Sequence, residues 1–249
     1  MLTGTASPDE FTDDAATMTA FDTAAVELAD VELFQAMFEM HIAGRERSLP
    51  PGLHPTAVPT FVVQVWRCAD SPWGAFSLAQ GRVGSRSGLR PRGHIQACVV
   101  DNETACDALR ARWGFPARLG AVTLERHYDA VDAAVVVDGG TVLALRGADP
   151  EPLDGGDVQY SGSVALAHTP RGLRLVQIEY DVTPSRTERV RPHLRAFDAV
   201  RFGVHPGVEP YYPVSASIVT ANVTLQALRF VSRPDELAFT GTEPVSTTG

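Results

Sequence analysis

Residues 109–120, LRARWGFPARLG, join a predicted helix to a predicted strand, and the fold assignment depends on them. The helix is expected over residues 102–113, which begin with an asparagine suited to an N-cap and place apolar side chains near one face. The Gly-Phe-Pro turn that follows ends this helix. The segment therefore predicts a helix, a turn and a strand, with Ala117 and Arg118 at the start of that strand.

Strand-like segments recur along the rest of the chain, separated by turn residues. They cover residues 34–40, 60–66, 93–100, 122–128, 133–145, 158–167 and 172–183. Asp138, Gly139 and Gly140 predict a tight hairpin turn inside one of them. A second helix is expected over residues 192–202. Many strands with two or three helices predict a β-rich α+β domain, as a barrel or a double-layered sheet.

Composition limits where the protein resides and what it binds. The chain has 249 residues and a net charge of −9, which argues against a nucleic-acid partner. It contains no apolar run long enough to span a membrane, and its first residues do not read as a signal peptide. Cys68, Cys98 and Cys106 fit neither a disulfide framework nor a metal pair. We expect a cytoplasmic protein without a metal ion or other cofactor.

Both ends of the chain are polar. Residues 1–20 are acidic and rich in small polar side chains, which predicts a mobile tail. Residues 239–249 predict a flexible tail in the same way. The expected organisation is therefore a single domain over residues 21–238.

Lysine is absent from the sequence, because all 21 basic residues are arginine. A lysine amine is the group that forms a Schiff base with a carbonyl substrate or with pyridoxal phosphate. The composition therefore excludes a lysine Schiff base anywhere in this chain.

The segment at 109–120 resembles the hallmark of the acetoacetate decarboxylase family. There, a helix bearing Gly-Arg-Glu is followed by a short spacer and Pro-Lys-Lys-Leu-Gly. Arg110, Pro116, Leu119 and Gly120 match this pattern, and Asp-Asn-Glu stands upstream at the expected distance. The segments LPPGL, PTFVVQVW, SPWGAF, QIEYDVT and AFDAVRF extend the resemblance over roughly residues 30–235. It implies a closed, cone-like, double-layered β-barrel with a few flanking helices, usually in a homo-oligomer.

The family's catalytic residues do not carry over. Ala117 stands where the resemblance places the Schiff-base lysine, and Arg118 stands where it places the second lysine. The family's substrate-binding arginine maps near Val31, and its two pocket glutamates map near Val62 and Leu78. The resemblance therefore predicts the family pocket without its covalent chemistry.

Arg118, Gln96 and Glu125 are the candidate catalytic residues. Arg118 could hold a carboxylate or stabilise an enolate oxygen, or it could turn outward into a salt bridge. Gln96 could bond a ligand or be a buried amide. Glu125 shares a strand face with His127, which suits either an acid/base pair or two solvent-facing side chains.

The remaining candidates are expected to bind substrate along the pocket wall. Phe115 is held between Gly114 and Pro116 beside the strand start. His94 lies two residues from Gln96 and is either a ligand contact or a satisfied strand-end histidine. Trp66 either shapes the cavity or packs in the core. The predicted wall comprises Phe115, Ala117, Leu78, Val62, Trp66, His94 and Arg110.

Two functions are compatible with these observations. The first is an enzyme that acts without a Schiff base on a carbonyl-bearing, largely apolar small molecule such as a polyketide-type intermediate. Cyclisation, dehydration, isomerisation and non-covalent decarboxylation are the candidate reactions. The second is a non-catalytic ligand-binding protein, or an inactive partner subunit, of the same fold.

Overall fold

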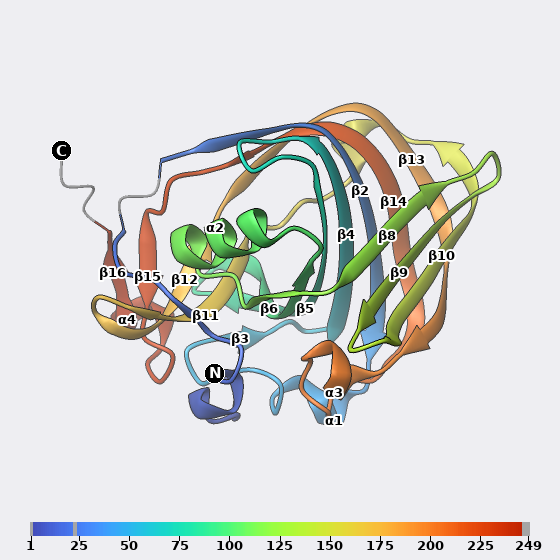
Figure 1. Ribbon diagram of the computed structural model, residues 1–249. Helices are drawn as coiled ribbons and strands as arrows, with labels where there is room; N and C mark the ends of the chain where they lie inside the picture. Colours follow the sequence, from blue (N-terminus) through green and yellow to red (C-terminus); the bar gives the residue numbers. More distant parts are fainter. Residues whose placement is uncertain (1, 22–23, 246–249) are drawn as a thin grey trace.

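The computed structural model describes residues 2–21 and 24–245, which form one strongly bent sheet with short flanking helices (Figure 1). The strands are β1 (Ala16–Thr17), β2 (Val26–Met40), β3 (His54–Pro55), β4 (Thr60–Asp70), β5 (Phe76–Ser87), β6 (Arg90–Val100), β7 (Ala117–Leu119), β8 (Ala121–Arg126), β9 (Ala130–Val137), β10 (Gly140–Pro152), β11 (Ser163–Thr169), β12 (Gly172–Ile178), β13 (Tyr180–Phe197), β14 (Pro210–Leu225), β15 (Phe230–Ser232) and β16 (Thr242–Pro244). The helices are α1 (Ile42–Arg45), α2 (Glu103–Trp113), α3 (Ala199–Phe202) and α4 (Ala238–Gly241), with 3₁₀ turns η1 (Pro8–Phe11) and η2 (Gly155–Asp157). The β-rich prediction is confirmed.

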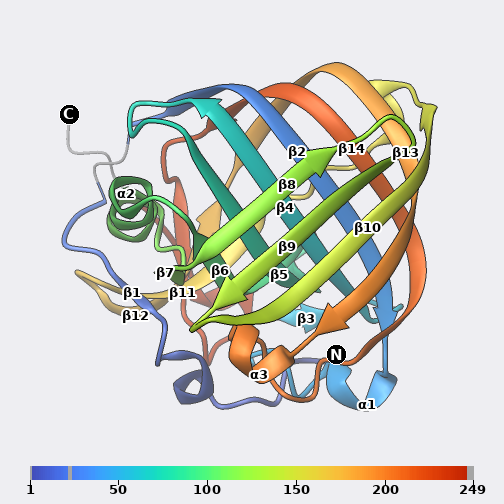
Figure 2. The same cartoon turned by 45° about the vertical axis from the view of Figure 1, so that its right-hand side comes forward.

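The strands follow the order β16-β15-β12-β11-β6-β5-β4-β2-β14-β13-β10-β9-β8, and the three short strands β1, β3 and β7 pair off this path. Within the described ranges, β16 and β8 are the two ends of the path and do not pair with each other. The expected closed barrel is therefore replaced by an open sheet. Its β8–β10 end crosses over β4, β5 and β6, as Figure 2 shows.

Side-chain alternation divides the core into two clusters on opposite faces of β4–β6. Along β4, Phe61, Val63 and Val65 pack with the β8–β10 hairpins, whereas Trp66 and Cys68 pack with α2. We call these the β9 face and the α2 face. Each face is covered by a different part of the chain, because a strand with both faces buried needs partners on both sides.

Helix α2 confirms the prediction for residues 102–113. The Asn102 side chain accepts a hydrogen bond from the Ala105 amide at 3.0 Å, as an N-cap does. Gly114 ends the helix in the left-handed region, with φ of 73°, which suits glycine. The hairpin turn between β9 and β10 is also confirmed.

The expected second helix over residues 192–202 is wrong for most of its length. Residues up to Phe197 continue β13, which pairs with β10, and only Ala199–Phe202 is helical. Pairing along the sheet outweighs the local apolar pattern there, since a long strand satisfies its backbone through its neighbours.

The N-terminal segment is packed where a mobile tail was expected. β1 pairs with β11, and Ala16 and Met18 are buried. Residue 1 lies outside the described ranges. Part of the segment before residue 20 therefore packs with the sheet.

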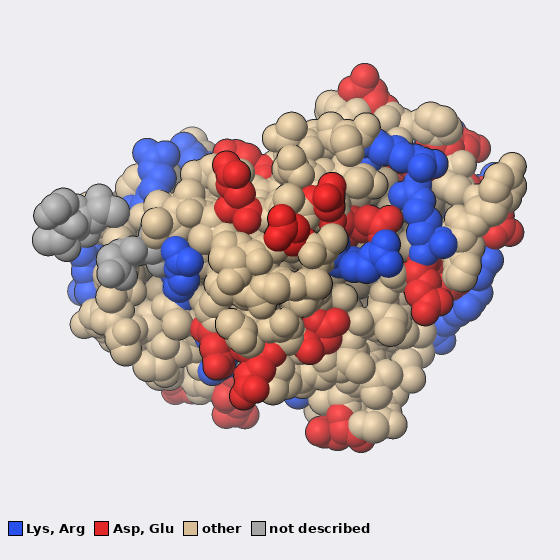
Figure 3. Space-filling view, turned by 45° about the horizontal axis from the view of Figure 1, so that its top comes forward, with Lys and Arg blue, Asp and Glu red and all other residues tan. Residues whose placement is uncertain are grey.

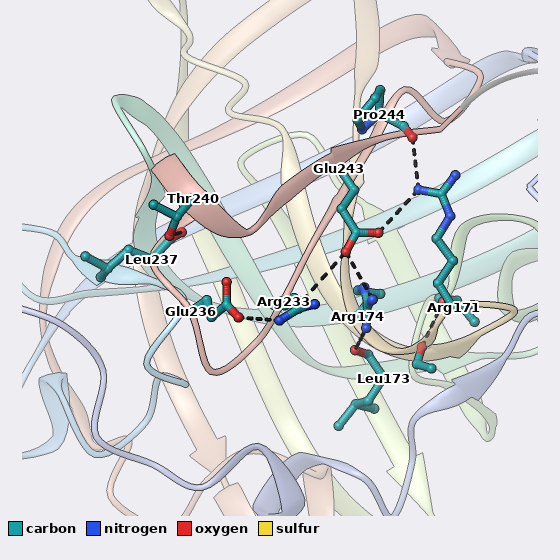
Figure 4. A network of polar contacts seen from close by, with 11 residues as sticks. Arg171, Leu173, Arg174, Arg233, Glu236, Leu237, Thr240, Glu243 and Pro244 are labelled. Atoms are coloured by element: carbon teal, nitrogen blue, oxygen red, sulfur yellow. Dashed lines mark hydrogen bonds and ion pairs between the residues drawn. The ribbon is translucent and has the colours of Figure 1, made fainter.

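The C-terminal segment is also tied to the sheet as far as residue 245. Glu243 on β16 forms ion pairs with Arg171, Arg174 and Arg233, as Figure 4 shows. This network joins β16 to the β11–β12 turn and to the end of β15. Residues 246–249, the rest of the predicted flexible tail, lie outside the described ranges.

Ion pairs also cover the outer surface of β9, β10 and β13, among them Arg189 with Glu151 and Arg195 with Asp132. In Figure 3, which turns the top of the molecule in Figure 1 towards the reader, acidic and basic side chains lie beside one another. No helix in the described ranges has the length and apolar character needed to cross a membrane.

Candidate functional site

Three glutamines form a hydrogen-bonded row on the α2 face. Gln64 donates to Gln35 at 2.6 Å, and Gln80 donates to Gln64 at 2.8 Å. The row exists because β2, β4 and β5 are adjacent and place these residues directly opposite one another. Its last acceptor, Gln80 Oε1, is buried and has no partner within the described ranges. A buried acceptor without a partner is rare. Gln80 is itself fully buried and is not among the residues that line the pocket over Arg82.

Arg82, two residues after Gln80 on the same face, is the main charged group of this site. Its side chain is 1% exposed. Nη1 donates to the Tyr180 hydroxyl at 2.7 Å and to Ser163 Oγ at 2.9 Å. Nε has no partner, and no carboxylate in the described part of the chain forms an ion pair with this guanidinium. A buried cation without a counter-ion is costly, so Arg82 is the place where an anionic ligand would gain most.

A pocket of about 400 Å³ lies over Arg82. Its lining includes Met37, Thr60, Val62, Arg92 and Tyr160. Burial raises the pKa of the Tyr160 phenol, and its hydroxyl has no partner within the described ranges. The pocket therefore combines apolar walls with several polar groups free to bind a ligand.

Arg92 and Glu179 form a two-point ion pair at the rim of this pocket. Arg92 is almost fully buried, whereas the Glu179 side chain is 33% exposed. The Glu179 carboxylate is therefore paired with an arginine. The pair occupies the carboxylate and leaves Arg82 without a counter-ion.

Four of the residues expected to bind substrate are buried together on the α2 face. Phe115, Ala117, Leu78 and Trp66 belong to the same packed cluster. Ala117 is the register partner of Cys98 on β6 and is 1% exposed, so its side chain points into the core. None of these four residues lines the pocket over Arg82, and their role in binding substrate stays a prediction. Trp66 Nε1 has no partner in the described part of the chain. With Val62 in the pocket lining, these residues lie on the same face as Arg82.

Arg118 lies on the opposite side of β7 from Ala117. Its register partner on the neighbouring strand β6 is Val99, which packs on the β9 face. Nη2 donates to the backbone carbonyl of Arg201, at the end of α3. This contact differs from both expectations, since Arg118 meets neither the pocket over Arg82 nor a carboxylate within the described ranges. Neighbouring strand residues point to opposite faces, so Ala117 and Arg118 cannot share one pocket.

Arg110 binds backbone carbonyls and does not line the pocket over Arg82. Its guanidinium donates to the carbonyls of Ala117 at 2.6 Å and of Asp14 and Ala15 at 3.2 Å each. It therefore holds the N-terminal segment against the α2–β7 turn.

Gln96 and His94 also face away from Arg82. Gln96 donates to the Ser48 carbonyl at 2.5 Å and accepts from the His205 amide at 3.0 Å, so it is a buried amide bonded to the backbone. A second pocket of about 440 Å³, beside Phe11 and His205, is lined in part by Gln96. Gln96 is thus separated from the pocket over Arg82 by the sheet.

His94 is fully buried on the β9 face. Both ring nitrogens lack a partner in the described part of the chain, and the Phe11 ring packs edge-on against the imidazole at 5.1 Å. Desolvation lowers the pKa of His94 to about 3. The alternative of a satisfied histidine is wrong, because neither ring nitrogen has a hydrogen-bond partner in the described residues. His94 is not among the residues that line the pocket over Arg82, and a ligand contact stays a prediction.

Glu125 is exposed on the outer surface of β8, near Asp132 and Arg195. Unlike the buried candidates, Glu125 is exposed to solvent. His127 lies 3.5 Å from the Asp132 carboxylate. The solvent-facing alternative describes both residues. Within the described ranges, no three His, Cys, Asp or Glu side chains are grouped so that they could hold a metal ion.

Comparisons with known proteins agree with this architecture. The family model described as acetoacetate decarboxylase (ADC) matches residues 13–192. The acetoacetate decarboxylase of Legionella pneumophila subsp. pneumophila str. Philadelphia 1 superposes with a TM-score of 0.71 at 18% identity, covering 83% of this chain and 86% of that one. A comparison with curated proteins finds no match.

Two further structures have the same fold. The enduracididine biosynthesis enzyme MppR, complexed with pyruvate, has a TM-score of 0.64 at 20% identity, covering 91% of this chain and 93% of that one. An acetoacetate decarboxylase-like enzyme from Sphingomonas wittichii RW1 has a TM-score of 0.63 at 15% identity, with 83% and 92% covered. These identities show a common fold alone. Because the family model spans more than half of its residues, the chain belongs to the acetoacetate decarboxylase family.

Proposed function

We propose that this protein is an enzyme that binds a carboxylate-bearing, otherwise largely apolar carbonyl compound over Arg82 and acts on it without a Schiff base. The observation that carries the proposal is the buried Arg82 guanidinium, for which no carboxylate partner is found in the described part of the chain. The absence of lysine supports a non-covalent reaction, since no lysine amine is available to attack a carbonyl.

The groups around Arg82 suit stabilisation of negative charge on oxygen. A guanidinium and the nearby Tyr180 hydroxyl, both held in a dry site, would lower the energy of an enolate as charge develops. Preorganised donors in such a site need no reorientation during the reaction. Polyketide-type intermediates are one class with the required carbonyl groups and apolar body.

The charge of Arg82 also ranks the candidate reactions. A carboxylate paired with Arg82 is stabilised in the ground state, which disfavours its loss as carbon dioxide. Dehydration, isomerisation and cyclisation keep the carboxylate, and are therefore favoured. A non-covalent decarboxylation would need the carbonyl oxygen, in place of the carboxylate, beside Arg82.

The row of glutamines favours a second candidate, a ligand-binding protein or partner subunit without catalysis. Gln35, Gln64 and Gln80 are neutral and largely bonded to one another, so they supply no acid or base. Detection of product after incubation with candidate substrates separates the two functions. The family resemblance also leads us to propose a homo-oligomer, which light scattering after size-exclusion chromatography tests.

Ligand binding tests the proposal directly. Benzoylacetate, an apolar 3-oxo carboxylate, is titrated against the protein, with its neutral methyl ester as the matched ligand control. Arg82→Met should weaken binding of the acid at least ten-fold and leave the weak binding of the ester unchanged. Arg174→Met, which removes an arginine ion-paired to Glu243, is the matched protein control. Equal affinity for acid and ester in the wild-type protein would contradict the proposal.

A further inference from the structure

The segment at residues 158–162, which we call the strap, crosses the pocket between η2 and β11. The Ser161 carbonyl oxygen accepts hydrogen bonds from the Tyr180 hydroxyl at 2.8 Å and from Arg82 Nη1 at 3.3 Å. Two donors of the candidate site therefore converge on one oxygen of the protein's own backbone. A carbonyl oxygen in this position has the hydrogen-bonding character of a ligand oxygen.

A second carbonyl oxygen of the strap accepts a hydrogen bond from the row of glutamines. Gln35, at one end of the row, donates from Nε2 to the Gln159 carbonyl oxygen at 3.5 Å. The strap thus meets donors from β2, β5 and β13 through main-chain oxygens alone. Main-chain oxygens are neutral acceptors, so the charge of Arg82 stays uncompensated while the strap is in place.

The strap has few other attachments. Its far end is held by the Gly93 amide, which donates to the Gly162 carbonyl at 3.0 Å. Its near end follows η2, where the Asp154 side chain accepts from the Gly156 amide at 2.8 Å. Between these points the residues belong to no helix or strand and are partly or fully exposed, and Tyr160 packs its ring against the α2-face cluster. Displacing the strap therefore costs the packing of one aromatic ring and a few hydrogen bonds, and no strand pairing is lost.

We propose that the Ser161 carbonyl oxygen occupies the position of a ligand oxygen, and that a carboxylate-bearing ligand displaces the strap when it binds Arg82 and Tyr180. This inference rests on the proposed function, because it uses the same site. A carboxylate is a better acceptor for a guanidinium than an amide carbonyl, since charge-assisted hydrogen bonds are about twice as strong as neutral ones. The exchange therefore replaces an uncompensated buried charge with an ion pair.

The strap also determines which ligands enter. A neutral carbonyl compound offers Arg82 no more than the Ser161 oxygen already does, so it cannot offset the cost of moving the strap. An anion can. The strap therefore makes the site selective for carboxylates over their esters.

Limited proteolysis and ligand binding on full-length variants test this inference. Asp154→Ala removes the cap of η2 and loosens the near end of the strap without touching the pocket lining. Asp157→Ala is the matched control, because Asp157 lies in the same turn and its side chain caps nothing. We expect Asp154→Ala to bind benzoylacetate about five-fold tighter than wild type, the size of a lost cap, and Asp157→Ala to bind like wild type. Saturating ligand should speed chymotrypsin cleavage after Tyr160 in the wild-type protein, because a displaced strap is more accessible to the protease.

The outcomes separate the strap from the proposed function. Ligand binding with unchanged or slower cleavage after Tyr160, together with unchanged affinity in Asp154→Ala, would overturn the strap inference and leave the proposed function standing. Binding by Asp154→Ala alone would support the strap as the barrier to entry. No binding by either protein would overturn both.

Discussion

Arg82 and Tyr180 meet 2.7 Å apart on the α2 face, although 98 residues separate them in the chain. The guanidinium is buried against neutral oxygens, and this arrangement costs stability in the ligand-free protein. Functional sites commonly retain such a cost because the same groups bind the ligand. The stability of the protein and its affinity for a ligand therefore both depend on Arg82.

Arg82→Met should leave the folded protein as stable as the wild type or more stable. Methionine approximates the arginine stem and needs no counter-ion, and replacing a buried charge by an apolar side chain is often neutral or stabilising. The midpoint of urea unfolding measures this. A loss of several kcal/mol would show that the charge is compensated by the protein itself.

Borohydride in the presence of acetoacetate should leave this protein without a stable adduct. Reductive trapping needs an amine that forms an imine, and the chain contains no lysine. Intact-mass spectrometry followed by peptide mapping checks the result. An adduct within residues 90–130 would refute the non-covalent mechanism, whereas modification of the terminal amine would not.

Arg118→Met should lower the free energy of unfolding by about 1 kcal/mol and leave ligand binding unchanged. The variant loses one hydrogen bond to the Arg201 carbonyl and nothing at the pocket over Arg82. Thermal unfolding and titration with benzoylacetate on the same variant measure both effects. Binding weakened ten-fold at unchanged stability would place Arg118 at the ligand instead.

Local signals in the sequence predict helix α2 and the turn that follows it. Asn102 and Gly114 cap α2 through contacts within a few residues, so their roles can be predicted without tertiary structure. The inward direction of Ala117 follows from the family frame. Extending the same frame to Arg118 fails, because strand alternation sends adjacent side chains to opposite faces.

The row of glutamines and Arg82 could not be assembled from the sequence. Their contacts depend on which strands are neighbours and on the register between them, and both are long-range properties. One signal was available: Gln64 and Gln80 interrupt apolar strands at VVQVW and LAQGR, where a buried polar residue needs a partner. The position of residues 1–20 was likewise hidden, because polar composition does not reveal pairing with β11.

His94 should make stability depend on pH in a window that the sequence alone does not suggest. The pKa of His94 falls from an ordinary value of 6.5 to about 3 because the ring is buried without partners. Between these values the unfolded chain binds a proton that the folded protein does not. The free energy of unfolding therefore falls as pH is lowered from about 6.5 towards 3, by up to about 1.4 kcal/mol for each pH unit from this residue.

Two leucine variants isolate this contribution from that of the carboxylates. His94→Leu removes the titrating ring from the buried site, so the variant should lose stability less steeply than the wild type as pH falls below 6.5. His168→Leu, at an exposed position on β11, is the matched control and should follow the wild-type profile. Urea unfolding at pH 7.5, 6.0, 5.0 and 4.0, conditions chosen to span the window (roughly the range between the two pKa values), measures the three profiles. If the free energy of unfolding of His94→Leu and of the wild type depends on pH in the same way, the ring binds a proton equally well in the folded and the unfolded protein. That result would contradict the lowered pKa of His94.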